Sequence, residues 1–178
     1  YLLDRLVESD PKLNLIKQRI EACRVFVGTT STMQSRSNIF ALKHFNLAVI
    51  DEASQILEPN IVGLLSANTP QPLALRLGLN AANDNVPAID KFVLIGDHKQ
   101  LPAVVQQNAT QAAVNHPLLN AIGITDCRQS LFERLIHWER SQGRTRFIGT
   151  LNRQGRMHPH IARFPNDMFY THEQIDVV

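Results

Sequence analysis

Two short apolar runs that each end in an acidic turn constrain the fold of this chain more than any other feature. They are residues 45–52 (FNLAVIDE) and residues 91–97 (KFVLIGD). In nucleotide hydrolases built on a parallel sheet, a buried strand delivers acidic residues at its carboxyl end, where one carboxylate can hold Mg²⁺ and the next can orient water. The pattern therefore predicts two strands of a parallel sheet, with Asp51 and Glu52 as candidate catalytic carboxylates.

The usual counterpart of such an acidic pair, a phosphate-binding loop, does not occur in the sequence. Its spacing is G-x-x-x-x-G-K-[ST], because backbone N–H groups must approach the phosphates and a lysine must reach them. No lysine of the chain follows a glycine or precedes a serine or threonine. We therefore expect the chain to be part of an enzyme and to be inactive by itself.

The composition is that of a globular protein with an uneven distribution of positive charge. At 178 residues, with 44% hydrophobic and 19% charged residues, the chain can bury a core of ordinary domain size. The formal net charge is only +2, but residues 128–163 contain eight arginines and two acids. Such asymmetry favours phosphate-bearing partners. The alternative is a solvated helix face whose arginine stems pack on the protein.

The cysteines and the hydropathy pattern argue against several classes of protein. Cys23 and Cys127 lack the spacing of a zinc site or a disulfide framework, which favours a reducing, cytoplasmic location. No apolar run approaches the roughly 20 residues that a membrane-spanning helix requires, so no membrane partner is expected. Residues 1–5 lack a signal-peptide pattern and resemble the interior of a helix.

The apolar periodicity predicts four short strands that alternate with helices, which implies βα units and a parallel sheet. The strands are expected at residues 24–28, 45–50, 92–95 and 146–151. Helices are expected at residues 2–22 with a break at 10–11, and at 37–44, 56–65, 131–138 and 159–170. Residues 69–90 are expected to form an irregular surface excursion, and residues 106–129 to be partly ordered.

Four strings occur in the order in which one enzyme family has them. They are residues 27–32 (VGTTST), 51–55 (DEASQ), 96–102 (GDHKQLP) and 151–159 (LNRQGRMHP). Together with residues 130–135 (SLFERL) and 164–170 (FPNDMFY), they resemble superfamily 1 helicases, most of all the branch that includes the nonsense-mediated-decay RNA helicase. The resemblance covers nearly the whole chain but only the middle of the family's motor.

The resemblance implies an α/β chain with a RecA-like P-loop NTPase fold, in which helices flank a parallel sheet. That fold would be incomplete here, because the unit with the phosphate loop is absent from the sequence. Helicases of this family have two RecA-like domains, with ATP and Mg²⁺ in the cleft between them. Residues 1–152 would be the later part of the first domain, and residues 153–178 would begin the second.

The implied activity is ATP hydrolysis coupled to movement along single-stranded DNA or RNA. The implied partners are single-stranded nucleic acid and the remainder of the motor, in cis or as a partner chain. Two other interpretations stay open: a non-catalytic nucleic-acid-binding or interaction module that kept the helicase half-fold, and a split ATPase whose partner chain supplies the phosphate loop. Backbone-directed binding does not distinguish DNA from RNA, nor does the sequence indicate direction or pathway.

The resemblance assigns roles to the two acidic turns. Asp51 would bind Mg²⁺ directly or through water, and Glu52 would be the base that positions the attacking water. The alternative is an acidic pair that only caps a following helix. Gln100 would sense the γ-phosphate, because its amide can donate to a phosphate oxygen and accept from water; otherwise it is a turn glutamine without a role. Asp97 is expected to tie the turn rather than to bind metal.

The resemblance also assigns roles outside the acidic turns. Arg156 would approach the γ-phosphate from the second domain as an arginine finger; the alternative is an arginine packed along the linker. A set of hydroxyl side chains would bind a nucleic-acid backbone, or would cap a helix instead: Thr29, Thr30, Ser31 and Thr32. Gly155 departs from the family, in which an aromatic residue is common at this position, and so puts stacking on the nucleotide base in question.

Overall fold

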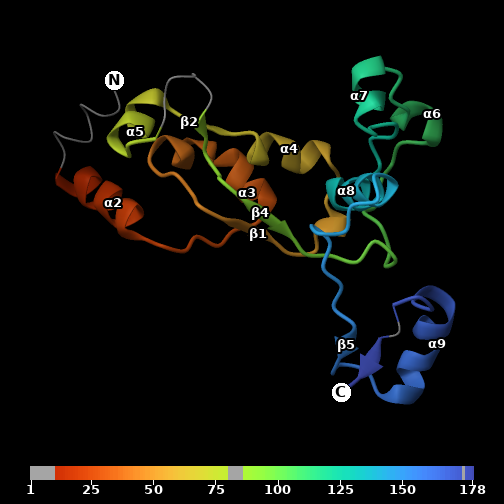
Figure 1. The fold of residues 1–178 in the computed structure, drawn as a ribbon. Coiled ribbons are helices and arrows are strands. Elements are labelled where there is room, and N and C mark those ends of the chain that lie inside the picture. The colour runs from red at the N-terminus through yellow and green to blue at the C-terminus, as the bar shows by residue number, and fades with distance from the viewer. Residues whose placement is uncertain (1–10, 80–85, 174) are drawn as a thin grey trace.

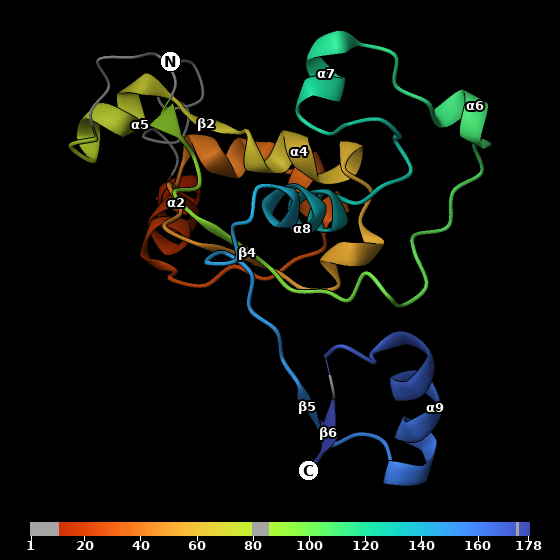
Figure 2. The same ribbon diagram turned by 45° about the vertical axis from the view of Figure 1, so that its right-hand side comes forward.

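The computed structural model describes residues 11–79, 86–173 and 175–178, and these residues form two units of unequal size (Figure 1). The larger unit runs from α2 (Pro11–Ala22) to α8 (Leu131–Ser141). The smaller unit contains β5 (Arg153–Gln154), α9 (Pro159–Phe169) and β6 (Asp176–Val177). Figure 2 shows the same separation from a second side, with an extended segment after α8 leading from one unit to the other.

A parallel pair of strands forms the centre of the larger unit. β1 (Ala48–Ile50) pairs with β4 (Phe92–Leu94) in the register Ala48 to Phe92 and Ile50 to Leu94. The two strands run in the same direction, so their carboxyl ends lie at the same end of the pair. The prediction of parallel strands at these two apolar runs is confirmed, and the fold is mixed α/β.

The other two predicted strands are wrong. Residues 24–28 and residues 146–151 are irregular, and Val27 and Leu151 are 95% and 87% exposed. A short apolar run forms a strand only where a neighbouring strand takes up its backbone hydrogen bonds, and no described strand flanks either run. Two small sheets occur elsewhere instead: β2 (Asn68–Thr69) pairs antiparallel with β3 (Val86–Pro87), and β5 pairs parallel with β6.

The predicted helices are largely present, with shifted bounds. α2 follows Asp10, α4 (Pro59–Leu65) begins at its proline, and residues 37–41 form the 3₁₀ helix η1 (Ser37–Ala41). Residues 2–10 of the first predicted helix lie outside the described residues. The segment 106–129 contains α6 (Ala109–Ala112) and α7 (Pro117–Ala121), in agreement with partial order. None of the helices within the described ranges has the length and hydropathy to span a bilayer.

The described parts of the predicted excursion, residues 69–79 and 86–90, are more ordered than predicted, and residues 80–85 lie outside the described residues. The described parts contain α5 (Gln71–Arg76), and Ala74 and Ala88 are 0% exposed. Ala88 and Ile89 join Phe40 and Leu64 in one core cluster beside β1. The prolines and asparagines of this segment suggested a loop, but its small apolar side chains pack against the core.

A second core cluster lies directly under the end of β1 and supports the turn that follows. It consists of Ile50, Ala53, Ile61 and Leu131. Because these side chains come from β1, the following turn, α4 and α8, the cluster fixes the acidic turn to both helices. The 3₁₀ helix η2 (Ala53–Gln55) continues from that turn.

Several of the arginines that make the sequence locally basic pair with carboxylates. Arg134 donates to Glu58 from Nη2 at 2.5 Å and from Nε at 2.6 Å, and both side chains are nearly buried. This pair joins the start of α4 to α8. The other pairs in residues 128–163 are Arg128 with Asp126, Arg144 with Glu139, and Arg163 with Asp167. Among the described residues, half of the eight arginines in that segment therefore form an ion pair with a carboxylate.

Candidate functional site

The turn after β1 holds its acidic pair in a strained backbone conformation. Glu52 has φ 51° and ψ 35°, the left-handed region, and is the only non-glycine residue with positive φ in the part of the chain that the structure describes. Asp51 Oδ1 accepts a hydrogen bond from the Glu52 N–H at 2.9 Å, and both side chains are exposed. Such conformations cost about 1–3 kcal/mol and cluster at functional sites.

The turn after β4 is fastened to the turn after β1. Ala53 N–H donates to the Ile95 carbonyl at 2.8 Å, and Asp97 N–H donates to the buried Ser54 hydroxyl at 3.1 Å. Gly96 permits this approach, because a Cβ there would lie 2.8 Å from the Ser54 nitrogen. The two acidic turns therefore form one rigid assembly at the carboxyl end of the strand pair.

The Asp97 carboxylate accepts hydrogen bonds from three residues at the turn after β4. Its Oδ1 accepts from the Lys99 N–H at 3.0 Å, and its Oδ2 accepts from Gln100 Nε2 at 3.0 Å and from the Tyr170 hydroxyl. Burial pushes the pKa of Asp97 upward, but the hydrogen bonds from Tyr170, Lys99 and Gln100 outweigh it and hold the pKa below its usual value. The carboxylate is therefore ionised at neutral pH and engaged by protein donors.

Gln100 lies on the same rigid assembly as Asp51 and Glu52, so the structure places these three predicted residues on adjoining turns. One N–H of its amide is used by Asp97. The side chain also hydrogen-bonds the Tyr170 hydroxyl, a contact that partly opposes the rise of the Tyr170 pKa. The Gln100 side chain is thus held by both Asp97 and Tyr170.

Arg156 lies apart from these three residues, on the turn between β5 and α9. Its backbone N–H donates to Gln154 Oε1 at 2.9 Å, and the same oxygen accepts from Met157 N–H at 2.7 Å. Its guanidinium is exposed and forms no hydrogen bond or ion pair within the described ranges. Beside it, a Cβ on Gly155 would meet nothing within 4 Å, so an aromatic side chain would fit there.

The hydroxyl segment is used in part as a helix cap. Thr29 is the N-cap of α3 (Thr30–Ser35): its Oγ1 accepts from Thr32 N–H at 3.1 Å and donates to Thr32 Oγ1 at 2.9 Å. The cap agrees with the alternative interpretation of these hydroxyls, that they cap a helix. The hydroxyls of Thr29 and Thr32 are therefore satisfied by each other, whereas Ser31 is exposed.

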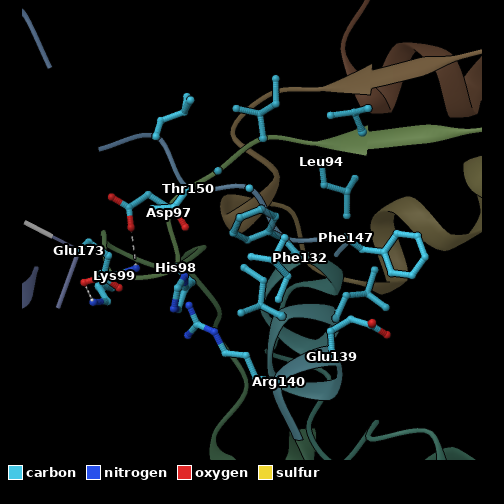
Figure 3. Close-up of a pocket in the computed structure, with 18 of the residues that line it drawn as sticks. Leu94, Asp97, His98, Lys99, Phe132, Glu139, Arg140, Phe147, Thr150 and Glu173 are labelled. Carbon is cyan, nitrogen blue, oxygen red and sulfur yellow. Dashed lines mark hydrogen bonds and ion pairs between the residues drawn. The ribbon is translucent and has the colours of Figure 1, made fainter. Parts of the chain in front are cut away.

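A cleft of about 860 Å³ opens beside β4, and residues from both units line it (Figure 3). Asp97, Lys99 and Glu173 lie at one end, and Phe132 and Phe147 form an apolar wall at the other. His98 and Arg140 lie between these ends. Burial is the main cause that lowers the pKa of His98, and the Arg140 guanidinium adds to it.

Lys99, Tyr170 and Glu173 form a contact that sequence reasoning missed. Lys99 Nζ donates to Glu173 Oε2 at 2.6 Å and to the Phe169 carbonyl at 2.8 Å, and it lies 5.4 Å from the Tyr170 ring centroid. Lys99 and Tyr170 both occur in strings that carry the family resemblance, but nothing in the sequence indicates that two segments about 70 residues apart meet. This contact is the main connection of the smaller unit to the turn after β4.

The donor set suits magnesium and only part of a nucleotide. Asp51 presents an exposed carboxylate, a hard oxygen ligand, and Mg²⁺ is commonly held by one or two carboxylates together with substrate phosphates. Within the described ranges, no group of three or more His, Cys, Asp or Glu could hold a metal ion by itself. The residues present therefore fit the metal side of an ATP·Mg²⁺ complex, whereas the phosphates need a loop that this sequence does not contain.

Comparison with known proteins identifies relatives along most of the chain. The chain is 32% identical over 127 residues to the regulator of nonsense transcripts 1 homolog of Neurospora crassa. The match covers 71% of this chain and 8% of that protein. The chain is also 29% identical over 144 residues to the DNA replication ATP-dependent helicase/nuclease DNA2 of Gallus gallus, 81% of this chain and 11% of that protein.

A third relative is the ATP-dependent helicase NAM7 of Saccharomyces cerevisiae, 30% identical over 127 residues, which are 71% of this chain and 9% of that protein. The chain thus spans about a tenth of the length of these curated relatives. No protein-family model matches it.

Proposed function

Because this chain is related over most of its length to superfamily 1 helicases, we propose that it is a segment of an ATP-dependent helicase motor. The motor couples ATP hydrolysis to movement along single-stranded nucleic acid. The observation that carries the proposal is the fastening of the Asp51–Glu52 turn to the Gln100 turn at one end of a parallel strand pair. A RecA-like fold, with its first domain ending near residue 152 and its second beginning near residue 153, belongs to the same proposal.

The acidic turns supply the metal ligand and the base. Asp51 holds Mg²⁺, which neutralises phosphate charge when bound, and Glu52 orients the attacking water. Gln100 contacts the γ-phosphate through its side-chain amide, which can donate to a phosphate oxygen and accept from water. Phosphoryl transfer depends mainly on positioning and electrostatic stabilisation, and a turn that is fixed by two hydrogen bonds and a close glycine contact supports such positioning.

Arg156 completes the site in a closed arrangement of the two units. No contact joins it to the acidic turns within the described residues, so the second domain must move for its guanidinium to reach the γ-phosphate. The remainder of the motor, in cis or as a partner chain, supplies the phosphate loop. An exposed arginine without a carboxylate partner supports this role, because nothing in the described chain competes for its charge.

Nucleic acid binds through backbone phosphates. Thr30 and Ser31 keep hydroxyls that the α3 cap does not use, and Thr29 and Thr32 hold the helix that presents them. Residues 128–163 add arginines without carboxylate partners within the described ranges: Arg146, Arg153 and Arg156. Hydroxyls and arginines of this kind contact phosphates without reading bases.

A chimera tests the proposal. In this protein, these 178 residues replace the matching segment of yeast NAM7, and we call it the NAM7 chimera. We expect it to release phosphate from ATP at a rate that single-stranded nucleic acid stimulates. Glu52→Gln should stop turnover and leave ATP bound, whereas Glu139→Gln, in an ion pair outside the turns, should leave turnover unchanged. Hydrolysis that persists in Glu52→Gln would refute the base assignment.

The 178-residue chain by itself provides the second measurement. We expect it to bind labelled single-stranded oligonucleotides and to release no phosphate from ATP. Phosphate release that Glu52→Gln abolishes would show that the loop is not needed. Oligonucleotide binding by the chain, together with a folded NAM7 chimera that binds ATP without hydrolysing it, would support the non-catalytic module instead.

A further inference from the structure

We propose that Tyr170 is a positioning residue that orients Gln100 through Asp97, so that the smaller unit controls the γ-phosphate sensor of the larger one. The inference rests on the proposed function for the role of Gln100, and on the observed contacts for the role of Tyr170. Neither the resemblance nor the relatives assign a task to this tyrosine. Its place at the end of α9, against the turn after β4, is what points to one.

One carboxylate oxygen of Asp97 accepts hydrogen bonds from both Tyr170 and Gln100. Asp97 Oδ2 accepts from the Tyr170 hydroxyl and from Gln100 Nε2, while Oδ1 accepts from the Lys99 N–H. Tyr170 also hydrogen-bonds the Gln100 side chain itself, which adds a direct contact to the one through Asp97. A carboxylate with donors on both oxygens has a fixed plane, and that plane fixes the direction from which the Gln100 amide can donate. Removal of the tyrosine donor leaves the carboxylate free to turn toward the Lys99 amide or toward water.

The contacts of Lys99 hold the smaller unit against the turn after β4. Lys99 Nζ lies between the Phe169 carbonyl and Glu173 Oε2 and close to the Tyr170 ring. The Lys99 hydrogen bond lowers the pKa of Glu173, so this carboxylate is ionised at neutral pH. Figure 3 shows Lys99 and Glu173 beside Asp97, at the end of the cleft nearest the smaller unit. A movement of α9 therefore acts on Asp97 directly.

Tyr170 and Asp97 keep the protonation states that their hydrogen bond requires across the neutral pH range. Burial, and next the hydrogen bond to Asp97, raise the pKa of Tyr170 to about 12. The hydrogen bonds of Asp97 hold its pKa below the ordinary value of 3.8. The phenol therefore remains a donor and the carboxylate an acceptor under all conditions in which a helicase works.

The spectroscopic test uses the 178-residue chain and needs no ATP hydrolysis. In ¹⁵N–¹H correlation spectra, Gln100→Glu identifies the side-chain amide signals of Gln100 by their disappearance. Tyr170→Phe removes the hydroxyl and keeps the ring beside Lys99, and we expect it to shift these amide signals. Arg144→Met, which breaks a surface ion pair of the larger unit, is the matched control and should leave them in place. Gln100 signals that do not respond to Tyr170→Phe would overturn the proposal.

The kinetic test separates positioning from a structural role. In the NAM7 chimera, Tyr170→Phe should lower kcat by about tenfold, the effect of losing one hydrogen bond that orients a catalytic group. If Tyr170 acts through Gln100, the same change added to Gln100→Ala should lower kcat no further, whereas additive effects would overturn the proposal. If Gln100 responds in the spectra but the folded chimera hydrolyses no ATP, the contact stands and the helicase assignment fails.

Discussion

Replacement of Gly96 by alanine tests whether the two acidic turns are held together by close backbone contact. A Cβ at this position would lie 2.8 Å from the Ser54 nitrogen, and ordinary contact begins at 3.4 Å, so the turns must separate by about 0.6 Å. That movement lengthens the bonds Ala53 N to Ile95 O and Asp97 N to Ser54 Oγ, now 2.8 and 3.1 Å. The φ of Gly96 is not in the left-handed region, so the effect is purely steric.

The expected cost follows from these two consequences. Overpacking costs about 1–3 kcal/mol and each of the two weakened hydrogen bonds about 0.5–1.5 kcal/mol, so Gly96→Ala should lower the free energy of unfolding by about 2–6 kcal/mol. Urea unfolding followed by the fluorescence of Trp138, the single tryptophan, measures this quantity.

Gly63→Ala is the matched control. Gly63 lies inside α4 with nothing within 4 Å of a new Cβ, and this change should stabilise the protein by about 0.5–1 kcal/mol. A Gly96→Ala protein as stable as the wild type would refute the close-contact argument.

Three further predictions concern charged groups. Arg134→Met should lower the free energy of unfolding by about 3–5 kcal/mol, because it leaves the buried Glu58 carboxylate unpaired, and Glu58→Gln in the same protein should restore part of it; urea unfolding measures both. The pKa of Asp97 is lower in the folded state than in the unfolded state. The stability that this carboxylate contributes is therefore present above pH 3.8 and is lost as the pH falls through the lower folded pKa. Asp97→Asn should remove that part of the acid dependence, which unfolding curves at about pH 2–5 measure. In the NAM7 chimera, Arg156→Ala should lower kcat by roughly 10³–10⁵ if the arginine acts on the γ-phosphate, whereas an unchanged kcat with weaker nucleic-acid binding would assign it to the track.

The strand pair could be predicted from the sequence because two independent signals coincide at each strand. Residues 48–50 and 92–94 are apolar, and acidic turns follow both. Residues 24–28 and 146–151 show the same apolar character without a flanking strand to accept their hydrogen bonds. A strand depends on its neighbour as much as on its own residues, so composition alone could not separate the two cases.

The candidate site was predictable only where it follows from chain order. Asp51, Glu52 and Gln100 lie on turns that follow two strands predicted for one parallel sheet, and the carboxyl ends of parallel strands lie at the same edge of a sheet. Lys99 and Glu173, which are in contact, lie 74 positions apart in the sequence. The chain between them includes residues 146–151, which were predicted to form a strand. Its formation depends on where α9 lies, and no local pattern carries that information. The roles of Asp51, Glu52, Gln100 and Arg156 stay predictions.

The pairing of arginines within residues 128–163 limits how strongly salt can influence binding to a single strand. Each phosphate neutralised on single-stranded nucleic acid contributes about −0.7 to the slope of log K against log salt concentration. An arginine already neutralised by a carboxylate of the same chain displaces few counterions. If the chain binds nucleic acid as proposed, the three arginines of this segment without such a partner among the described residues contribute about −2 to the slope, and less if Arg156 faces the nucleotide. The eight arginines counted in the sequence would suggest about −6.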